Sequence, residues 1–182
     1  MSTPPILDAR GHPTPASTFL LVHRALRRDL VLLRAVAGCA GEPDAGQAGW
    51  VRERWRTFRA VLTEHHRAED ERIFPVLRSQ DPDLRPVLDV LDADHAALDE
   101  ILDRVEAAIE ALPAAPDRAA DAVADLAQVL DAHLGLEERE LLPAILVVAV
   151  PPLPAGADPD PDVLRWTVEG LDADTRAAFA LR

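Results

Sequence analysis

The chain has 182 residues, of which 48% are apolar, and a formal net charge of -13. This length fits one domain, or one domain with a tail, and the apolar fraction is sufficient to build a core. The acidic balance argues against nucleic acid or an anionic membrane as the main partner. No apolar stretch reaches the roughly 18 residues of a membrane span, and no apolar run follows a basic start as in a signal peptide. We therefore expect a cytoplasmic protein.

Residues 1–16 contain four prolines and are expected to form an extended arm. A first helix is expected over 17–37, where an apolar stripe has the three-and-four spacing of a packed helix and includes His23. A second helix is expected over 47–72, with Pro75 bending or ending it before a short extension to about 78. The apolar face of this helix is expected to continue through Ile73 and Val76.

A third helix is expected from 81 or 83 to about 112, with His95 as the only polar member of its stripe. A fourth begins at about 117, carries His133 and Glu137 on its apolar stripe, and extends beyond Pro143. Residues 150–161 are proline-rich and indicate a linker, and residues 162–181 are expected to form short helices that dock on the rest.

The expected fold is therefore all-α, because no segment shows the sustained two-residue alternation of a strand. Four helices joined by short loops predict an up-down-up-down four-helix bundle. The expected organisation is an extended arm over 1–16, the bundle over 17–149, and a proline-rich linker with a short helical C-terminal segment over 150–182.

A histidine and a glutamate lie one helical turn apart on the apolar face of two helices. These pairs are His65 with Glu69 and His133 with Glu137, and each is followed by two apolar residues and a proline. A buried imidazole or carboxylate must be paired, neutralised or bound to a metal, because burying an isolated charge is costly.

Each expected bundle helix has one histidine on its apolar stripe, at positions 23, 65, 95 and 133. A single core histidine is more often hydrogen-bonded than metal-bound, but four imidazoles and two carboxylates in one narrow core favour a metal site. Such ligands suit iron, manganese or zinc. Two carboxylates suggest two bridges and a dinuclear site, although a single metal ion remains an alternative.

The chain resembles the hemerythrin-like (HHE cation-binding) domain family over roughly residues 17–146. The resemblance rests on His23, on His95 after an acidic residue, and on the two His-x-x-x-Glu motifs with their trailing Ile73-Phe74-Pro75 and Leu141-Leu142-Pro143. It implies a four-helix bundle with two iron ions in a non-haem centre. By position, Glu69 and Glu137 would bridge the irons, and His23, His65, His95 and His133 would be terminal ligands.

One departure from the family concerns a fifth histidine. Oxygen-carrying hemerythrins have a His-x-x-x-His pair on the third helix, but here Leu91 and Asp99 flank His95. Alternative ligands for the missing position are Asp99, His66 and Asp70. Glu138 would be a further ligand if the phase of its helix shifted by one residue. A centre with fewer imidazoles favours reactivity or sensing over reversible O₂ carriage.

Three classes of function follow from these expectations. The first is a protein that binds, senses or reacts with O₂, peroxide or NO at the metal centre. The second is a di-iron enzyme, either a peroxide-decomposing oxidoreductase or an oxygenase that acts on a small organic substrate. The third is a metal-poor helical bundle that binds a partner protein.

Overall fold

The computed structural model describes residues 6–38, 43–147 and 161–179, and these are helical apart from loops and one isolated β-bridge between Leu7 and Pro13. The all-α prediction is confirmed. The α-helices are α1 (Ser17–Ala37), α2 (Ala45–Ala68), α3 (Phe74–Gln80), α4 (Arg85–Glu110), α5 (Pro116–Glu140), α6 (Leu142–Ile145), α7 (Pro161–Thr167) and α8 (Ala173–Ala178). A π-helical turn (Glu69–Ile73) joins α2 to α3, and a 3₁₀ turn (Pro82–Leu84) precedes α4.

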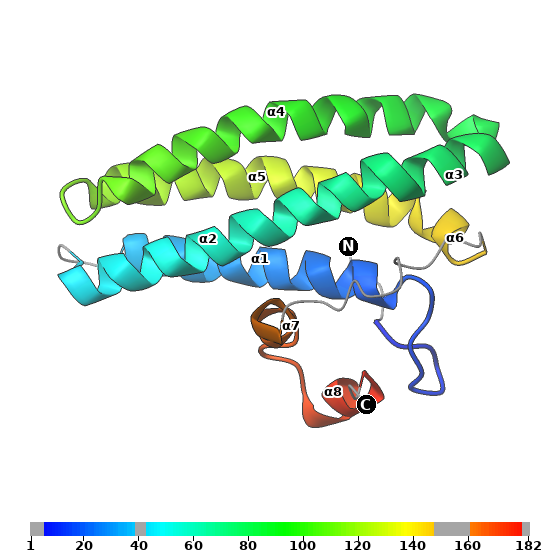
Figure 1. Ribbon diagram of the computed structural model, residues 1–182, viewed down its shortest axis with the longest axis horizontal. Helices are drawn as coiled ribbons and strands as arrows, with labels where there is room; N and C mark the ends of the chain where they lie inside the picture. The colour runs from blue at the N-terminus through cyan, green and yellow to red at the C-terminus, as the bar shows by residue number, and fades with distance from the viewer. Residues whose placement is uncertain (1–5, 39–42, 148–160, 180–182) are drawn as a thin grey trace.

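The long helices form the predicted four-helix bundle (Figure 1). Helix α1 packs against α2 and α5, and α4 packs against the same two helices on the other side. The π-helical turn and α3 continue α2, so together they make one long, bent arm of the bundle (Figure 1). Each arm thus has two neighbours and turns one stripe toward a shared interior.

The apolar core consists of two clusters separated along the bundle. In the larger cluster, the α1 residues begin at Ala25 and the α4 residues begin at Leu98. The smaller cluster lies toward the other end and contains Ala16, Phe19, Leu20, Phe74, Leu77, Leu88, Leu91, Leu141 and Ile145. The segments of the four arms between these clusters carry the buried histidines and glutamates, so a polar layer divides the core.

The π-helical turn corrects the expected apolar face after Glu69. The structure buries Phe74 and Leu77, each one position later than the expected Ile73 and Val76, which are only partly buried. In the π-helical turn the Phe74 N–H donates to the Glu69 carbonyl, five residues back. One extra residue in the turn shifts the phase of everything after it, and such turns are frequent at functional sites. Pro75 therefore does not end the helical arm, which continues to Gln80.

Helix α2 begins at Ala45, two residues before the expected start. Asp44 accepts a hydrogen bond from the Gln47 N–H, and the Gln47 side chain accepts one from the Asp44 N–H. This reciprocal capping box satisfies two backbone donors that a helix start leaves unpaired.

The C-terminal helices lie beside the bundle, with α7 packed against α1 (Figure 1). Trp166 of α7 is buried in the larger apolar cluster, and its indole N–H donates to Asp29 Oδ2 at 2.6 Å. Arg28 and Arg54 also donate to the fully buried Asp29 carboxylate. A buried carboxylate needs such partners, so the Asp29 hydrogen bond adds to the apolar packing that attaches α7 to the bundle.

The expected proline-rich linker falls largely on residues 148–160, which lie outside the described residues. Within the described ranges, no helix combines the length and apolar character needed to cross a membrane.

Candidate metal centre

The polar layer brings together five histidines and two glutamates from all four arms of the bundle. They divide into two groups whose potential ligand atoms lie within 4.8 Å of one another. We call the group whose histidines lie on α1 and α2 the two-His half, and the group whose histidines lie on α2, α4 and α5 the three-His half. The two-His half contains His23 and His65 with Glu69 and Glu137, and the three-His half contains His66, His95 and His133.

In the two-His half, the imidazoles of α1 and α2 face each other with their Nε2 atoms. His23 Nε2 lies 3.0 Å from His65 Nε2 and 3.3 Å from Glu137 Oε2. The Phe19 ring covers this half, with its centroid 4.1 Å from that of His23 and 5.4 Å from that of His65. The two imidazoles are thus packed between a pair of carboxylates and an aromatic ring.

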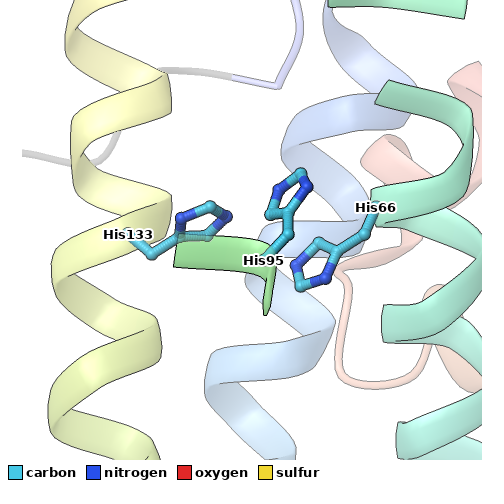
Figure 2. Close-up of side chains that lie close together, drawn as sticks. All are labelled: His66, His95 and His133. Carbon is cyan, nitrogen blue, oxygen red and sulfur yellow. The ribbon is translucent and has the colours of Figure 1, made fainter. Parts of the chain in front are cut away.

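In the three-His half, one imidazole comes from each of α2, α4 and α5, and the three rings lie close together (Figure 2). The rings of His66 and His95 are stacked, with centroids 4.0 Å apart and an interplanar angle of 13°. His133 meets them nearly edge-on, at angles of 74° to His66 and 64° to His95. His66 belongs to this group because it follows His65 directly and α2 turns by about 100° per residue.

The two glutamates extend across both halves of the centre. Glu69 Oε1 lies 3.5 Å from His65 Nε2, whereas its Oε2 lies 3.6 Å from His95 Nε2. Glu137 Oε2 lies 3.3 Å from His23 Nε2, whereas its Oε1 lies 3.0 Å from His133 Nε2. Each carboxylate therefore presents one oxygen to each half, which is the arrangement that a bridging ligand requires.

The unpaired buried atoms of the described chain test whether these residues suit metal ions. Apart from the indole nitrogen of Trp55, every buried side-chain nitrogen or oxygen without a hydrogen-bond partner lies in this layer. These atoms are His66 Nε2, His95 Nε2, His133 Nε2 and both carboxylate oxygens of Glu69 and Glu137. Buried polar atoms normally have partners, and imidazole nitrogens and carboxylate oxygens are ligands for iron, manganese and zinc. The donor set therefore fits two metal ions.

Burial keeps the two adjacent histidines of α2 neutral. Burial, together with the smaller effect of the positive charge of protonated His23, lowers the pKa of His65 to about 3. Burial likewise lowers the pKa of His66 to about 2, with the nearby His95 adding to the effect. A neutral imidazole has a free lone pair, as a metal ligand must.

The two glutamates have opposite pKa shifts although they share one site. Burial raises the pKa of Glu69 well above its ordinary value, and the charge of Glu137 raises it further. Burial also acts to raise the pKa of Glu137, but close contacts with His133, His23 and His95 lower it well below its ordinary value. Two close carboxylates do not both ionise readily. Cations between them would make both anionic, which is consistent with a metal centre.

A further carboxylate contacts the outward nitrogen of three of the five imidazoles, and we call these Asp70, Asp94 and Glu138 the outer carboxylates. Asp70 Oδ1 lies 2.8 Å from His95 Nδ1, and Asp94 Oδ2 lies 3.5 Å from His133 Nδ1. Glu138 Oε1 lies 2.9 Å from His23 Nδ1. Each acid neighbours a residue of the polar layer in sequence, yet contacts a histidine of the next arm around the bundle: α4, α5 and α1 in turn. Such partners orient metal-binding imidazoles.

The opposite pKa balance applies to His23 and His95. Burial lowers the pKa of His23, but its contacts with Glu137 and Glu138 raise it above the ordinary value. For His95, contacts with Glu137 and Asp70 likewise outweigh burial. The pKa of Glu138 is lowered because hydrogen bonds from His23 and Arg27 outweigh the effect of burial.

The structure brings together all six residues expected as ligands, and it adds His66 to them. Asp99, the other candidate for the missing ligand, is exposed on α4 and lies outside both groups. Asp70 and Glu138 face the outer side of imidazoles instead of joining either group. The layer thus contains five histidines, and the fifth, His66, comes from α2 and was one of the alternative ligands expected from the sequence. The adjacent pair His65-His66 was the sequence signal for it.

Comparisons with known proteins agree with this geometry. Neither the comparison with curated proteins nor that with solved structures finds a match. The model of the hemerythrin HHE cation binding domain matches residues 14–145. This range covers most of the chain and includes every residue of the polar layer. The chain therefore belongs to the hemerythrin HHE cation-binding domain family, whose His and carboxylate metal site corresponds to the polar layer of its bundle.

Proposed function

We propose that this chain is a non-haem dinuclear metal protein, with iron as the preferred metal, that binds or reacts with O₂, NO or peroxide. One observation carries the proposal: seven of the eight unpaired buried side-chain atoms of the described chain converge in the polar layer. Without cations these atoms would leave a large cost in lost hydrogen bonds. Manganese and zinc are the alternative metals, because the same ligand types bind them.

The small ligand is proposed to bind in the two-His half. That half offers two imidazole nitrogens and one oxygen from each glutamate, whereas the three-His half offers one more imidazole with the remaining oxygens. The half with fewer protein donors has more room for an added ligand. Iron held there would supply reversible binding or reduction of the ligand.

The chain's own residues have distinct roles in this proposal. Glu69 and Glu137 hold the two halves together, and the outer carboxylates orient three of the imidazoles. Phe19 and the apolar clusters on both sides exclude water from the layer. A dry surrounding strengthens electrostatic interactions within the site.

A small diatomic ligand or peroxide is preferred to an organic substrate because the cavity between α2 and α4 lies away from the centre. This cavity of about 700 Å³ is lined by Trp55, Arg56, Arg59, Ala60, Thr63, Glu64, Asp103 and Glu106. None of these residues belongs to the two halves of the centre. The oxygenase alternative therefore gains no support from this cavity.

Metal analysis of the full-length chain tests this proposal. The chain is loaded anaerobically with ferrous iron, freed of excess metal, and compared with a His133→Ala variant treated identically. We expect roughly two irons per wild-type chain, as in other dinuclear bundle proteins, and a clear loss in the variant. Changes in the optical spectrum on adding azide or peroxide would show an accessible coordination position. Absence of bound metal, or equal metal in both proteins, would overturn the proposal.

A further inference from the structure

Consecutive glutamates of α5 hold the same imidazole from its two sides. Glu137 Oε2 lies 3.3 Å from His23 Nε2, on the inner side, and Glu138 Oε1 lies 2.9 Å from His23 Nδ1, on the outer side. A neutral imidazole has one N–H, which donates, and one bare nitrogen, which accepts or binds metal. A carboxylate at Nδ1 places the proton there and leaves the Nε2 lone pair directed into the two-His half.

Glu138 is itself held in place by an arginine of α1. Arg27, one helical turn after His23, donates from Nη1 to the same Glu138 Oε1 that contacts the imidazole. The Nε of Arg27 donates to Asp131 Oδ1 at 2.7 Å, and Asp131 lies about two helical turns before Glu138 on α5. The guanidinium thus joins two acids of α5 to α1 directly beside the metal centre. A charge-assisted contact of this kind fixes geometry as well as adding stability.

The other two outer carboxylates lack this degree of enclosure. The side chain of Glu138 is 10% exposed, whereas those of Asp70 and Asp94 are 46% and 40% exposed. Asp94 is also 3.5 Å from its histidine, which is at the limit of a hydrogen bond. Water competes with exposed carboxylates for hydrogen bonds, so Glu138 restrains its imidazole most strongly.

We propose that Glu138, fixed by Arg27, is a positioning residue that sets the tautomer and orientation of His23 and thereby the metal affinity of the two-His half. The inference rests on the proposed function, because it concerns the half where the small ligand would bind. It assigns the Arg27–Glu138 pair a role that acts through His23, without contact to the metal. The metal affinity of the three-His half depends much less on the outer carboxylates Asp70 and Asp94.

The test is metal affinity of the full-length chain measured by chelator competition, with zinc as the probe. Glu138→Gln preserves the size of the side chain and removes its charge. We expect it to weaken one of the two zinc sites by about 10- to 100-fold, the usual effect of losing such a partner, and to leave the other unchanged. Arg27→Gln frees Glu138 without removing it and is expected to weaken the same site by a smaller factor.

Two control variants separate positioning from general loss of stability. Glu140→Gln changes a half-exposed acid near the end of the same helix, which pairs with Arg139, and should alter neither site. Asp94→Asn changes an outer carboxylate of the three-His half and should have a smaller effect, on the other site. Nitrogen-15 NMR of the zinc-loaded chain adds a direct readout: the His23 Nδ1 proton should exchange slowly in the wild type and faster in Glu138→Gln.

The outcomes distinguish this inference from the proposed function. Two zinc sites in the wild type with unchanged affinities in Glu138→Gln would overturn the inference alone. A His23 that carries its proton on Nε2 would also overturn it. No zinc or iron binding by the wild-type chain would overturn the proposed function and the inference together.

Discussion

The two halves of the metal centre are built from the same residue types but differ in number and support. The two-His half has two imidazoles, a covering Phe19 ring, and the enclosed Arg27–Glu138 pair. The three-His half has three imidazoles and outer carboxylates that reach solvent. One half thus has fewer ligands held more firmly, and the other has more ligands held less firmly.

This difference is what an open coordination position requires. A site with few ligands needs each of them to be oriented by its surroundings, because no additional ligand restrains the metal. A site with more imidazoles gains affinity from their number. The glutamates that span both halves are the only residues that the two have in common, so they provide the most severe test of the comparison.

The largest effect is expected for Glu137→Ala, which removes an oxygen from each half. Metal affinity should fall in both halves by more than the roughly 100-fold that follows loss of an outer hydrogen-bond partner. Metal content after gel filtration measures this, with Glu140→Ala as the control on the same helix. Retention of one full-strength metal site would show that Glu137 serves a single half.

The substitution His66→Ala should remove metal from the three-His half and leave the two-His half loaded. His66 contributes an imidazole only to the three-His half, so roughly one of two metal ions should be lost. Asp99→Asn is the matched control, because Asp99 is exposed and lies outside both groups. Metal content is measured in parallel for both variants and the wild type. Equal metal content in His66→Ala and the wild type would exclude His66 from the ligands.

Phe19→Leu should affect small-ligand access but not metal content. The smaller side chain opens space beside His23 and His65, so azide should bind the loaded chain several-fold faster in stopped-flow measurements. Phe58→Leu is the matched control, because Phe58 is fully buried in the larger apolar cluster and contacts neither histidine ring. Both variants should lose about 1–3 kcal/mol of unfolding free energy. Similar azide rates in the two would remove Phe19 from the access path.

The smallest effect is expected for Trp166→Phe, outside both halves. The variant loses the hydrogen bond from the indole N–H to Asp29, while Arg28 and Arg54 still hold the carboxylate. The free energy of unfolding should fall by about 1 kcal/mol, measured by urea titration, with Trp50→Phe at a more exposed tryptophan as control. Changed metal affinity would instead couple the C-terminal helices to the centre.

Sequence patterns alone predicted most of the bundle. Three- and four-residue spacing of apolar side chains identified the four arms and placed a histidine on the inner face of each. The two His-x-x-x-Glu motifs identified Glu69 and Glu137, because positions one turn apart share a face whatever surrounds the helix. These properties are local, and local periodicity is visible in the sequence.

The tertiary structure decided the features that depend on how the helices are rotated against one another. Whether His66 faces the core or its edge depends on a fraction of a turn of α2, and in the structure its ring lies in the core against those of His95 on α4 and His133 on α5. The partners of Asp70, Asp94 and Glu138 lie on neighbouring arms, so no spacing within one helix reveals them. The π-helical turn shifts the phase by one residue after Glu69, which brings Phe74 and Leu77 inward. The sequence by itself thus determined which residue types enter the core, and only the packing of four helices decided which atoms meet there.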